Sequence, residues 1–319
     1  MKGLSNARAR LAVIDDDSAG QRVDNWLLRE LKGVPRSHVY RLLRSGEVRV
    51  DSRRVEATHR LQVGERVRVP PVRTAAAAAR PVAPRPDPGF PAVYEDDVLL
   101  VIDKPAGVAV HGGSGVSFGV IEQLRAARPG VRTLELAHRL DRETSGLLML
   151  AKKRSALAAL HADLREGRVG KQYLALVKGP WRGGLRRVTA PLRKYLTAEG
   201  ERRVSVDRAD GLPSSTVFEV EAAYGANTLL RATLETGRTH QIRVHLAHLG
   251  HPILGDDKYG DFGLNKSLQR DGLKRMFLHA ARLEVAHPLT RAPLVLEAPL
   301  PPELAGFLDS IAAERAEAL

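Results

Sequence analysis

The hydrophobic pattern of the first 72 residues predicts two short helices and a small sheet. After an apolar run at 11–14, apolar residues recur at helical spacing in two segments. The second segment is expected to begin with Ser37 as its N-cap and to end at Gly46. Alternating apolar and polar residues then predict short strands at 47–50, 61–63 and 66–69. The outer face of the second helix would carry the basic side chains of Arg36, His38, Arg41 and Arg44.

A stretch rich in proline and alanine follows this unit. Residues 73–89 include five successive alanines, which offer no side chains for a core, and several prolines, which favour an extended backbone. We therefore predict four parts of the chain: an N-terminal segment (1–17), a small domain (18–72), a linker (73–89) and a large domain (90–319).

The large domain shows strand patterns with helical patterns between them and no repeated βαβ unit. Strands are expected within 93–107, 147–151, 170–178, 216–224 and 228–234. Ser155 and Thr239 are expected to N-cap two of the helices. These patterns predict an α+β fold, in which a mainly antiparallel mixed sheet is flanked by helices.

Positive charge is in clear excess over negative charge. Lys and Arg number 50 against 37 Asp and Glu, which gives a net charge of +13. Such a surplus favours polyanionic partners, of which nucleic acid is the commonest, although a merely soluble basic protein is the alternative. The chain has no cysteine, which excludes disulfides, zinc fingers, thiolate catalysis and iron–sulfur ligation.

The sequence contains no pattern typical of a membrane or export signal. The apolar run at 11–14 is too short for a secretory signal, and nothing approaches the about 18 apolar residues that span a bilayer. We expect a soluble cytoplasmic protein with no membrane partner.

A polar loop directly precedes the apolar run at 147–151, and such a loop is a suitable place for a functional site. Within it, Asp141 stands between Arg139 and Arg142. If these guanidinium groups lie close in space, they favour the ionised carboxylate. The alternative is a surface turn with solvated ion pairs.

Histidines at 240, 245, 248 and 251 raise the question of a metal site. A helical pair of histidine ligands is best spaced at i and i+4 with a carboxylate nearby. None of the four has that spacing to another, and no acidic residue lies among them. We therefore expect no metal at these residues.

Three blocks occur in a fixed order along the large domain. They read HRLDRETSG at 138–146, GKQYLALVKG at 170–179 and GRTHQIRVHL at 237–246. Together they resemble the RluA family of pseudouridine synthases, and residues 37–50 resemble the core of the S4 RNA-binding domain. The chain is most similar to the RluC branch of that family, which joins an S4 domain to the catalytic domain and acts on 23S ribosomal RNA.

This resemblance implies roles for four residues of the large domain. Asp141 would be the essential catalytic residue, either as a nucleophile toward the sugar or the base or by abstracting a sugar proton; the sequence leaves this choice open. Tyr173 would stack on the target base, Arg243 would pair with Asp141, and Arg139 would fill the gap left by the extruded base. No cofactor and no metal would be needed, because an isomerisation involves no redox change.

The resemblance also implies a partner. A monomeric enzyme would act on 23S ribosomal RNA or on the assembling large ribosomal subunit, with Arg36, Arg41 and Arg44 contacting the RNA backbone. Two other functions stay open: a non-catalytic S4-type RNA-binding ribosome assembly factor, and a metal-dependent RNA hydrolase that uses the histidines. The modified uridines cannot be read from the sequence.

Overall fold

The structure of the protein is a computed structural model that describes residues 9–15, 18–31, 34–72, 89–112, 118–198 and 200–317. The chain divides into two compact units, with the main division between residues 85 and 86. Except for Gly89, the expected linker at 73–89 lies outside the described residues. Most of the expected N-terminal segment also lies outside them. The domain boundaries therefore stay predictions.

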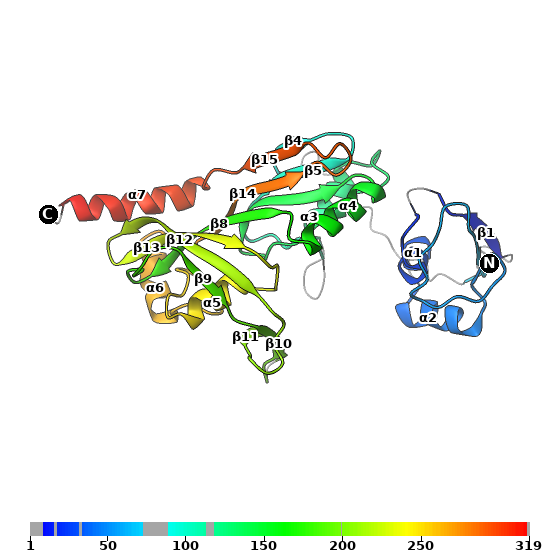
Figure 1. Cartoon of the computed structure of the whole chain (residues 1–319), viewed down its shortest axis with the longest axis horizontal. Helices are drawn as coiled ribbons and strands as arrows, with labels where there is room; N and C mark the ends of the chain where they lie inside the picture. Colours follow the sequence, from blue (N-terminus) through cyan, green and yellow to red (C-terminus); the bar gives the residue numbers. More distant parts are fainter. Residues whose placement is uncertain are drawn as a thin grey trace, which may run out of the picture. The chain divides into compact units, whose positions relative to one another are not determined.

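The first unit combines two helices with a three-stranded antiparallel sheet (Figure 1). The strand order is β1-β3-β2. The elements are β1 (Arg10–Val13), α1 (Val23–Glu30), α2 (Arg36–Ser45), β2 (Arg49–Val50) and β3 (Arg66–Val69). The predicted apolar stripes form one core, in which Trp26 and Leu27 of α1 meet Leu42 of α2 and Val67 of β3.

In this unit, the structure confirms one predicted helix end and contradicts one predicted N-cap and one predicted strand. The helix end at Gly46 is confirmed, because this glycine has a left-handed backbone (φ 73°). Ser37 was wrong as the N-cap: α2 already begins at Arg36, directly after Pro35, whose ring fixes φ at −57°. The strand at 61–63 was also wrong. Leu61 is buried in the core, but its backbone bonds to Gly20 and Gln21, which lie in a loop.

The second unit is built on a ten-stranded sheet, and the predicted α+β fold is confirmed. The strand order is β4-β5-β7-β14-β8-β13-β12-β9, with β15 added to β14 and β6 to β7. Among the described residues every pairing in this sheet is antiparallel except that of β7 with β14. The strands are β4 (Ala92–Glu95), β5 (Leu99–Lys104), β6 (Glu135–Leu136), β7 (Ser145–Ala151), β8 (Gly170–Lys178), β9 (Arg186–Thr189), β12 (Ser215–Tyr224), β13 (Asn227–Leu234), β14 (Leu278–Ala286) and β15 (Pro293–Glu297).

Helices and a separate hairpin complete this unit. The hairpin consists of β10 (Leu192–Leu196) and β11 (Arg202–Val206), which pair only with each other among the described strands. The helices are α3 (Val120–Ala127), α4 (Arg154–Arg165), α5 (Gln241–His248), α6 (Phe262–Arg270) and α7 (Pro302–Glu317). In the described part of the chain, no helix has the length and apolar character needed to cross a membrane.

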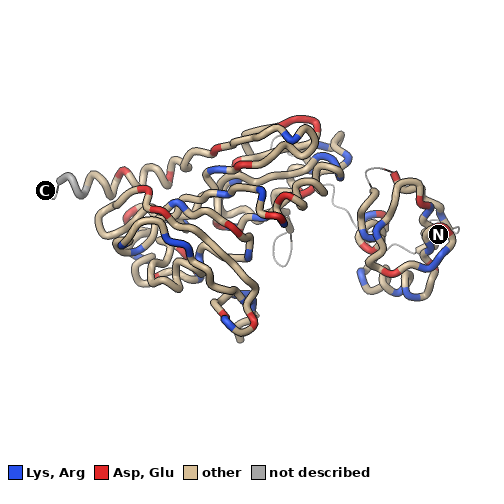
Figure 2. Tube along the Cα trace, in the orientation of Figure 1, with Lys and Arg blue, Asp and Glu red and all other residues tan. Residues whose placement is uncertain are grey.

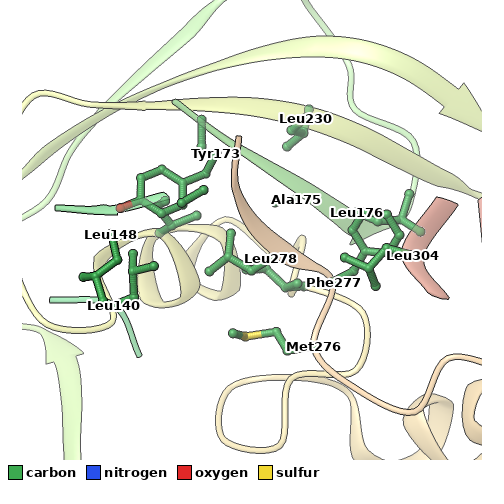
Figure 3. Packing of buried hydrophobic residues seen from close by; sticks show 14 of the residues in the cluster. Leu140, Leu148, Tyr173, Ala175, Leu176, Leu230, Met276, Phe277, Leu278 and Leu304 are labelled. Carbon is green, nitrogen blue, oxygen red and sulfur yellow. The ribbon is translucent and has the colours of Figure 1, made fainter. Parts of the chain in front are cut away.

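The two faces of the sheet are covered by two apolar clusters. Along β7, Leu148 and Leu150 join the cluster that also contains residues of α3, α5, α6 and α7, whereas Leu147 and Met149 join the cluster that contains residues of α4. Figure 3 shows part of the first cluster around Tyr173. Residues 147–151 of β7 form a continuous apolar run, as expected for a strand that is covered on both faces.

Two predicted N-caps in this unit were wrong. Helix α4 begins at Arg154, so Ser155 lies inside its first turn. Helix α5 begins after His240, which has a left-handed backbone (φ 54°), and Thr239 does not cap it. The predicted hairpin at 216–224 and 228–234 is confirmed, with a two-residue turn between β12 and β13.

Gly146 lies where β7 pairs with β14, at a position that leaves no room for a side chain. Its φ is +108°, and a Cβ at this position would lie 2.3 Å from the carbonyl oxygen of Ala280. We expect Gly146→Ala to lower the free energy of unfolding by at least about 2 kcal/mol, because both the left-handed backbone and the clash penalise a side chain. Thermal and denaturant unfolding measure the effect.

Gly306→Ala provides the matched control. Gly306 lies exposed inside α7, and a Cβ there meets open space. The same substitution should therefore stabilise the protein by up to about 1 kcal/mol. Equal stabilities of the two variants would contradict the close approach at Gly146.

Candidate active site

A cleft of about 860 Å³ in the second unit brings the three sequence blocks together. Its walls come from the loop at 137–144, from Lys171 and Tyr173 on β8, and from the segment at 234–243. Five Lys or Arg side chains line the cleft against two carboxylates, those of Asp141 and Glu235. The cleft is therefore positively charged and suited to an anionic substrate.

The loop that carries Asp141 is fixed at its start by His138. The backbone N–H of Met149 donates to Nε2 of His138 at 3.1 Å, and the N–H of Ala137 donates to the carbonyl of Met149 at 3.0 Å. Burial and the positive charge of Lys171 lower the pKa of His138 to about 4. The ring is therefore neutral at physiological pH, and its unprotonated nitrogen can accept this bond.

The same loop is held further along by a buried lysine. Lys104, at the end of β5, donates from Nζ to the carbonyls of Pro105 (2.8 Å), Val108 (2.9 Å) and Arg142 (3.1 Å). Burial, together with the charge of Arg275, lowers the pKa of Lys104 to about 7. Lys104 therefore connects the loop beside Asp141 to β5, an inner strand of the sheet, a role that the sequence reasoning missed.

Asp141 and Arg243 lie 102 residues apart in the sequence and meet in the cleft. Nη1 of Arg243 donates to Oδ2 of Asp141 at 3.3 Å. The Arg243 side chain is 3% exposed, and that of Asp141 is 25% exposed. The side chain of Arg243 is buried against carboxylates. The carboxylate of Asp141 thus reaches the cleft while its ion pair is shielded from water.

The flanking arginines do not provide this charge. Arg142 donates from Nε to Glu143 at 2.7 Å. Arg139 is exposed and lines the cleft, and among the described residues neither flanking arginine lies within ion-pairing distance of Asp141. The condition that these guanidinium groups lie close to the carboxylate is therefore not met, and the partner of Asp141 comes from α5.

Asp256 orients Arg243 through two parallel hydrogen bonds. Nε of Arg243 donates to Oδ2 of Asp256 at 2.7 Å, and Nη2 donates to Oδ1 at 2.6 Å. Oδ1 also accepts the backbone N–H groups of Lys258 and Tyr259. Burial disfavours both charges and is the largest single effect, but the hydrogen bonds and the attraction of opposite charges together outweigh it. The pKa of Asp256 is therefore lowered and that of Arg243 is raised.

His240 and Tyr259 form a second polar contact to Asp141. Nε2 of His240 lies 3.8 Å from Oδ1 of Asp141, and Nδ1 lies 2.7 Å from the hydroxyl oxygen of Tyr259. Burial lowers the pKa of His240 and raises that of Tyr259 to about 12. A protonated Tyr259 hydroxyl therefore donates to Nδ1 of a neutral imidazole, which leaves the hydrogen on Nε2, facing Asp141.

Tyr173 is buried on β8 and lines the cleft near Leu140 and Leu148 (Figure 3). Burial and the negative charge of Asp141 raise its pKa. The phenol is therefore neutral at physiological pH. The structure brings Asp141, Tyr173, Arg139 and Arg243 to one cleft.

The arginines predicted to bind RNA lie in the first unit. Arg36, Arg41 and Arg44 are exposed on α2. Lys and Arg positions recur along this helix in Figure 2. Arg41 is partly engaged, since Nη2 lies 2.7 Å from Nε2 of His38 and Nη1 lies 3.7 Å from Glu47.

Two of the four histidines considered as metal ligands, His245 and His251, bind protein groups. His245 is fully buried and bonds to Thr216 and Ser214, and Nδ1 of His251 lies 3.0 Å from the carbonyl oxygen of Lys178. Among the described residues no group of three His, Cys, Asp or Glu side chains is arranged to hold a metal ion. These contacts give His245 and His251 structural roles.

Comparison with known proteins identifies the family of this chain. A model of the RNA pseudouridylate synthase family matches residues 98–248, and a model of the S4 domain matches residues 21–67. Ribosomal large subunit pseudouridine synthase C of Pasteurella multocida (strain Pm70) is 49% identical over 96% of this chain and 95% of its own length. The protein of that name from Escherichia coli (strain K12) is 51% identical over 91% of this chain and 93% of its own length. The chain belongs to the RNA pseudouridine synthase family.

Solved structures give the same assignment. Human RNA Pseudouridylate Synthase Domain Containing 4 matches with a TM-score of 0.57 and 25% identity, over 69% of this chain and 92% of that structure. The corresponding values for Human RNA Pseudouridylate Synthase Domain Containing 1 are 0.55 and 28%, over 68% and 87%. The protein is thus an isomerase that carries an S4 domain before its pseudouridine synthase domain.

The buried pair of Arg243 and Asp256 should be essential for stability. We expect Asp256→Asn to lower the free energy of unfolding by about 3–5 kcal/mol, because it leaves the Arg243 charge buried without the nearest of its carboxylates. Denaturant unfolding at neutral pH measures this loss.

Asp257→Asn is the matched control for this variant. Oδ1 of Asp257 also lies 3.2 Å from Nη2 of Arg243, but its side chain is 61% exposed. Its removal should cost less than about 1 kcal/mol. Similar losses in the two variants would argue against Asp256 as the residue that holds Arg243.

Proposed function

We propose that this enzyme converts uridines of the large-subunit ribosomal RNA to pseudouridine, with Asp141 as the catalytic carboxylate. The observation that best supports this proposal is the Asp141–Arg243 pair. It lies at the wall of the cleft where the three sequence blocks meet. The relatives from Pasteurella and Escherichia are named for the large ribosomal subunit, which supports this class of substrate.

The reaction exchanges one bond of the nucleotide for another. The bond between N1 of uracil and C1′ of ribose breaks, a bond between C5 and C1′ forms, and C5 loses a proton while N1 gains one. Asp141 attacks the sugar or the base, or removes a sugar proton. Each of these routes uses an ionised carboxylate, and Arg243 supplies the opposite charge that stabilises it.

Tyr173 and Arg139 handle the base in this proposal. A uridine within an RNA helix must first be extruded, which costs on the order of a few kcal/mol. The neutral ring of Tyr173, held by β8, stacks on the extruded base, and such stacking contributes about 1–3 kcal/mol per base. Arg139, exposed at the rim of the cleft, takes the place that the base has left.

The first unit supplies affinity through phosphate contacts. Arg36, Arg41 and Arg44 present positive charge on one exposed helix, and such contacts read the RNA backbone more than its sequence. We propose that a monomer binds ribosomal RNA, either free or in the assembling subunit, in the cytoplasm.

Replacement of the carboxylate tests the central role of Asp141. Asp141→Asn keeps the shape but removes the charge, so we expect turnover to fall by at least about 100-fold. Affinity for RNA should change little. Release of tritium from C5 of labelled uridine in ribosomal RNA measures turnover.

Glu143→Gln is the control from the same loop. Glu143 pairs with Arg142 outside the cleft, so its neutralisation should leave turnover within about twofold of the wild type. Turnover of Asp141→Asn within tenfold of the wild type would refute the proposed chemistry.

Simultaneous replacement of Arg36, Arg41 and Arg44 by alanine tests the role of the first unit. Each lost phosphate contact should reduce the salt slope of log affinity by roughly 0.7–0.9. Turnover at saturating RNA should stay unchanged, because the cleft belongs to the second unit. Filter binding at several salt concentrations and saturating kinetics measure the two quantities. A collapse of turnover would show that the first unit shapes the active site.

A further inference from the structure

A second groove, of about 360 Å³, lies between the β10–β11 hairpin and the segment 237–239. The hairpin extends beyond the main sheet of its unit (Figure 1). It is nevertheless anchored at its base, where Leu192 and Val204 pack against Val244 of α5. The groove is therefore a built feature of the second unit.

The lining of this groove combines apolar and basic side chains. Leu192, Val204 and Leu212 provide the apolar part, and Leu212 is largely exposed. The charged residues that line the groove are Arg193, Lys194, Arg238 and Asp210, three cations and one anion. A ribose-phosphate unit, which has an apolar sugar face and one negative charge, fits this combination.

Two of the cations remain available to a ligand. Arg193 is compensated by Asp207 at 3.2 Å and Asp210 at 3.1 Å. Lys194 is exposed, and within the described part of the chain it makes no ion pair. Arg238 is fixed because its Nε donates to the carbonyl of Pro213 at 3.0 Å, and its terminal N–H groups form no ion pair with described residues.

The groove adjoins the active-site cleft. Gly237, Arg238 and Thr239 line both cavities. The next residue, His240, lies 3.8 Å from the carboxylate of Asp141. A strand of RNA with one nucleotide in the cleft would therefore have its neighbouring backbone beside Arg238.

The hairpin is also tied to the loop that orients Arg243. Nη1 of Arg203 donates to the carbonyl of Lys258 at 2.7 Å, the N–H of Val204 donates to the hydroxyl of Tyr259 at 2.9 Å, and Lys258 pairs with Glu201. The loop with Lys258 and Tyr259 also contains Asp256. A ligand in the groove is thus held at a fixed distance from the Asp141 site.

We propose that this groove is a second RNA subsite, in which Lys194 and Arg238 bind the backbone phosphate of a nucleotide next to the target uridine. The inference rests on the proposed function and extends it to the flanking RNA strand. The partner is RNA, because the free groups at the groove are cationic and the groove shares a wall with the cleft that takes a nucleotide.

Lys194→Ala, Arg238→Ala and the double variant test this subsite in the full-length protein. With protein-free transcribed 23S ribosomal RNA, we expect KM to rise severalfold in each single variant while kcat stays within about twofold. The salt slope of log affinity should fall by roughly 0.7–0.9 for each phosphate contact removed. Arg270→Ala, at the exposed end of α6 and outside both cavities, is the control and should behave as the wild type.

The outcomes separate this subsite from the catalytic proposal. Binding is measured both in the wild type and in Asp141→Asn, so the groove variants give an affinity and a salt slope even if Asp141 is not the catalytic group. Unchanged KM and unchanged salt slope, in variants that melt at the wild-type temperature, would overturn the subsite. A second outcome would also overturn the subsite. If the variants modify protein-free RNA normally but are defective on large-subunit particles, the groove contacts a ribosomal protein instead of RNA.

Discussion

The buried guanidinium of Arg243 is the group on which the site of this protein depends. A buried cation is tolerated only when anions and acceptors surround it, and here Asp256, Asp257 and Asp141 provide the anions. The face of the Tyr259 ring, with its centroid 5.1 Å from the guanidinium carbon, adds a further favourable contact. The charge of Arg243 thereby holds three parts of the chain together: α5, the loop with Asp256 and the loop with Asp141.

The central strands hold these parts in place. Lys104 at the end of β5 and His138 before β7 fix the Asp141 loop, and β8 carries Tyr173. Because β7 is covered on both faces, the loop follows an element with little freedom to move. The polar residues of the site are thus attached to strands that are packed in the apolar core. This packing holds the ionised side chains in a precise geometry although they lie beside solvent.

The pattern of apolar residues predicted the fold class. The three sequence blocks, which occur in the order typical of the family, indicated the side chains that meet in the cleft. The sequence reasoning missed Asp256, since the partner of a buried arginine depends on which loop packs over its helix. The predicted cap at Thr239 failed because His240 adopts a left-handed backbone beside the site, a strained conformation that local propensity does not anticipate. At Leu61 the apolar pattern correctly indicated burial, but no neighbouring strand pairs with it.

The position of β14 has a consequence for how the enzyme is made. This strand lies between β7 and β8, and it pairs in parallel with β7 where Ser145 meets His279. The supports of Asp141 and Tyr173 therefore become neighbours only through a strand that begins 100 residues after the end of β8. A nascent chain that has not yet released residue 286 from the ribosome lacks this strand, and the joining of the two halves of the site is a late, long-range step of folding.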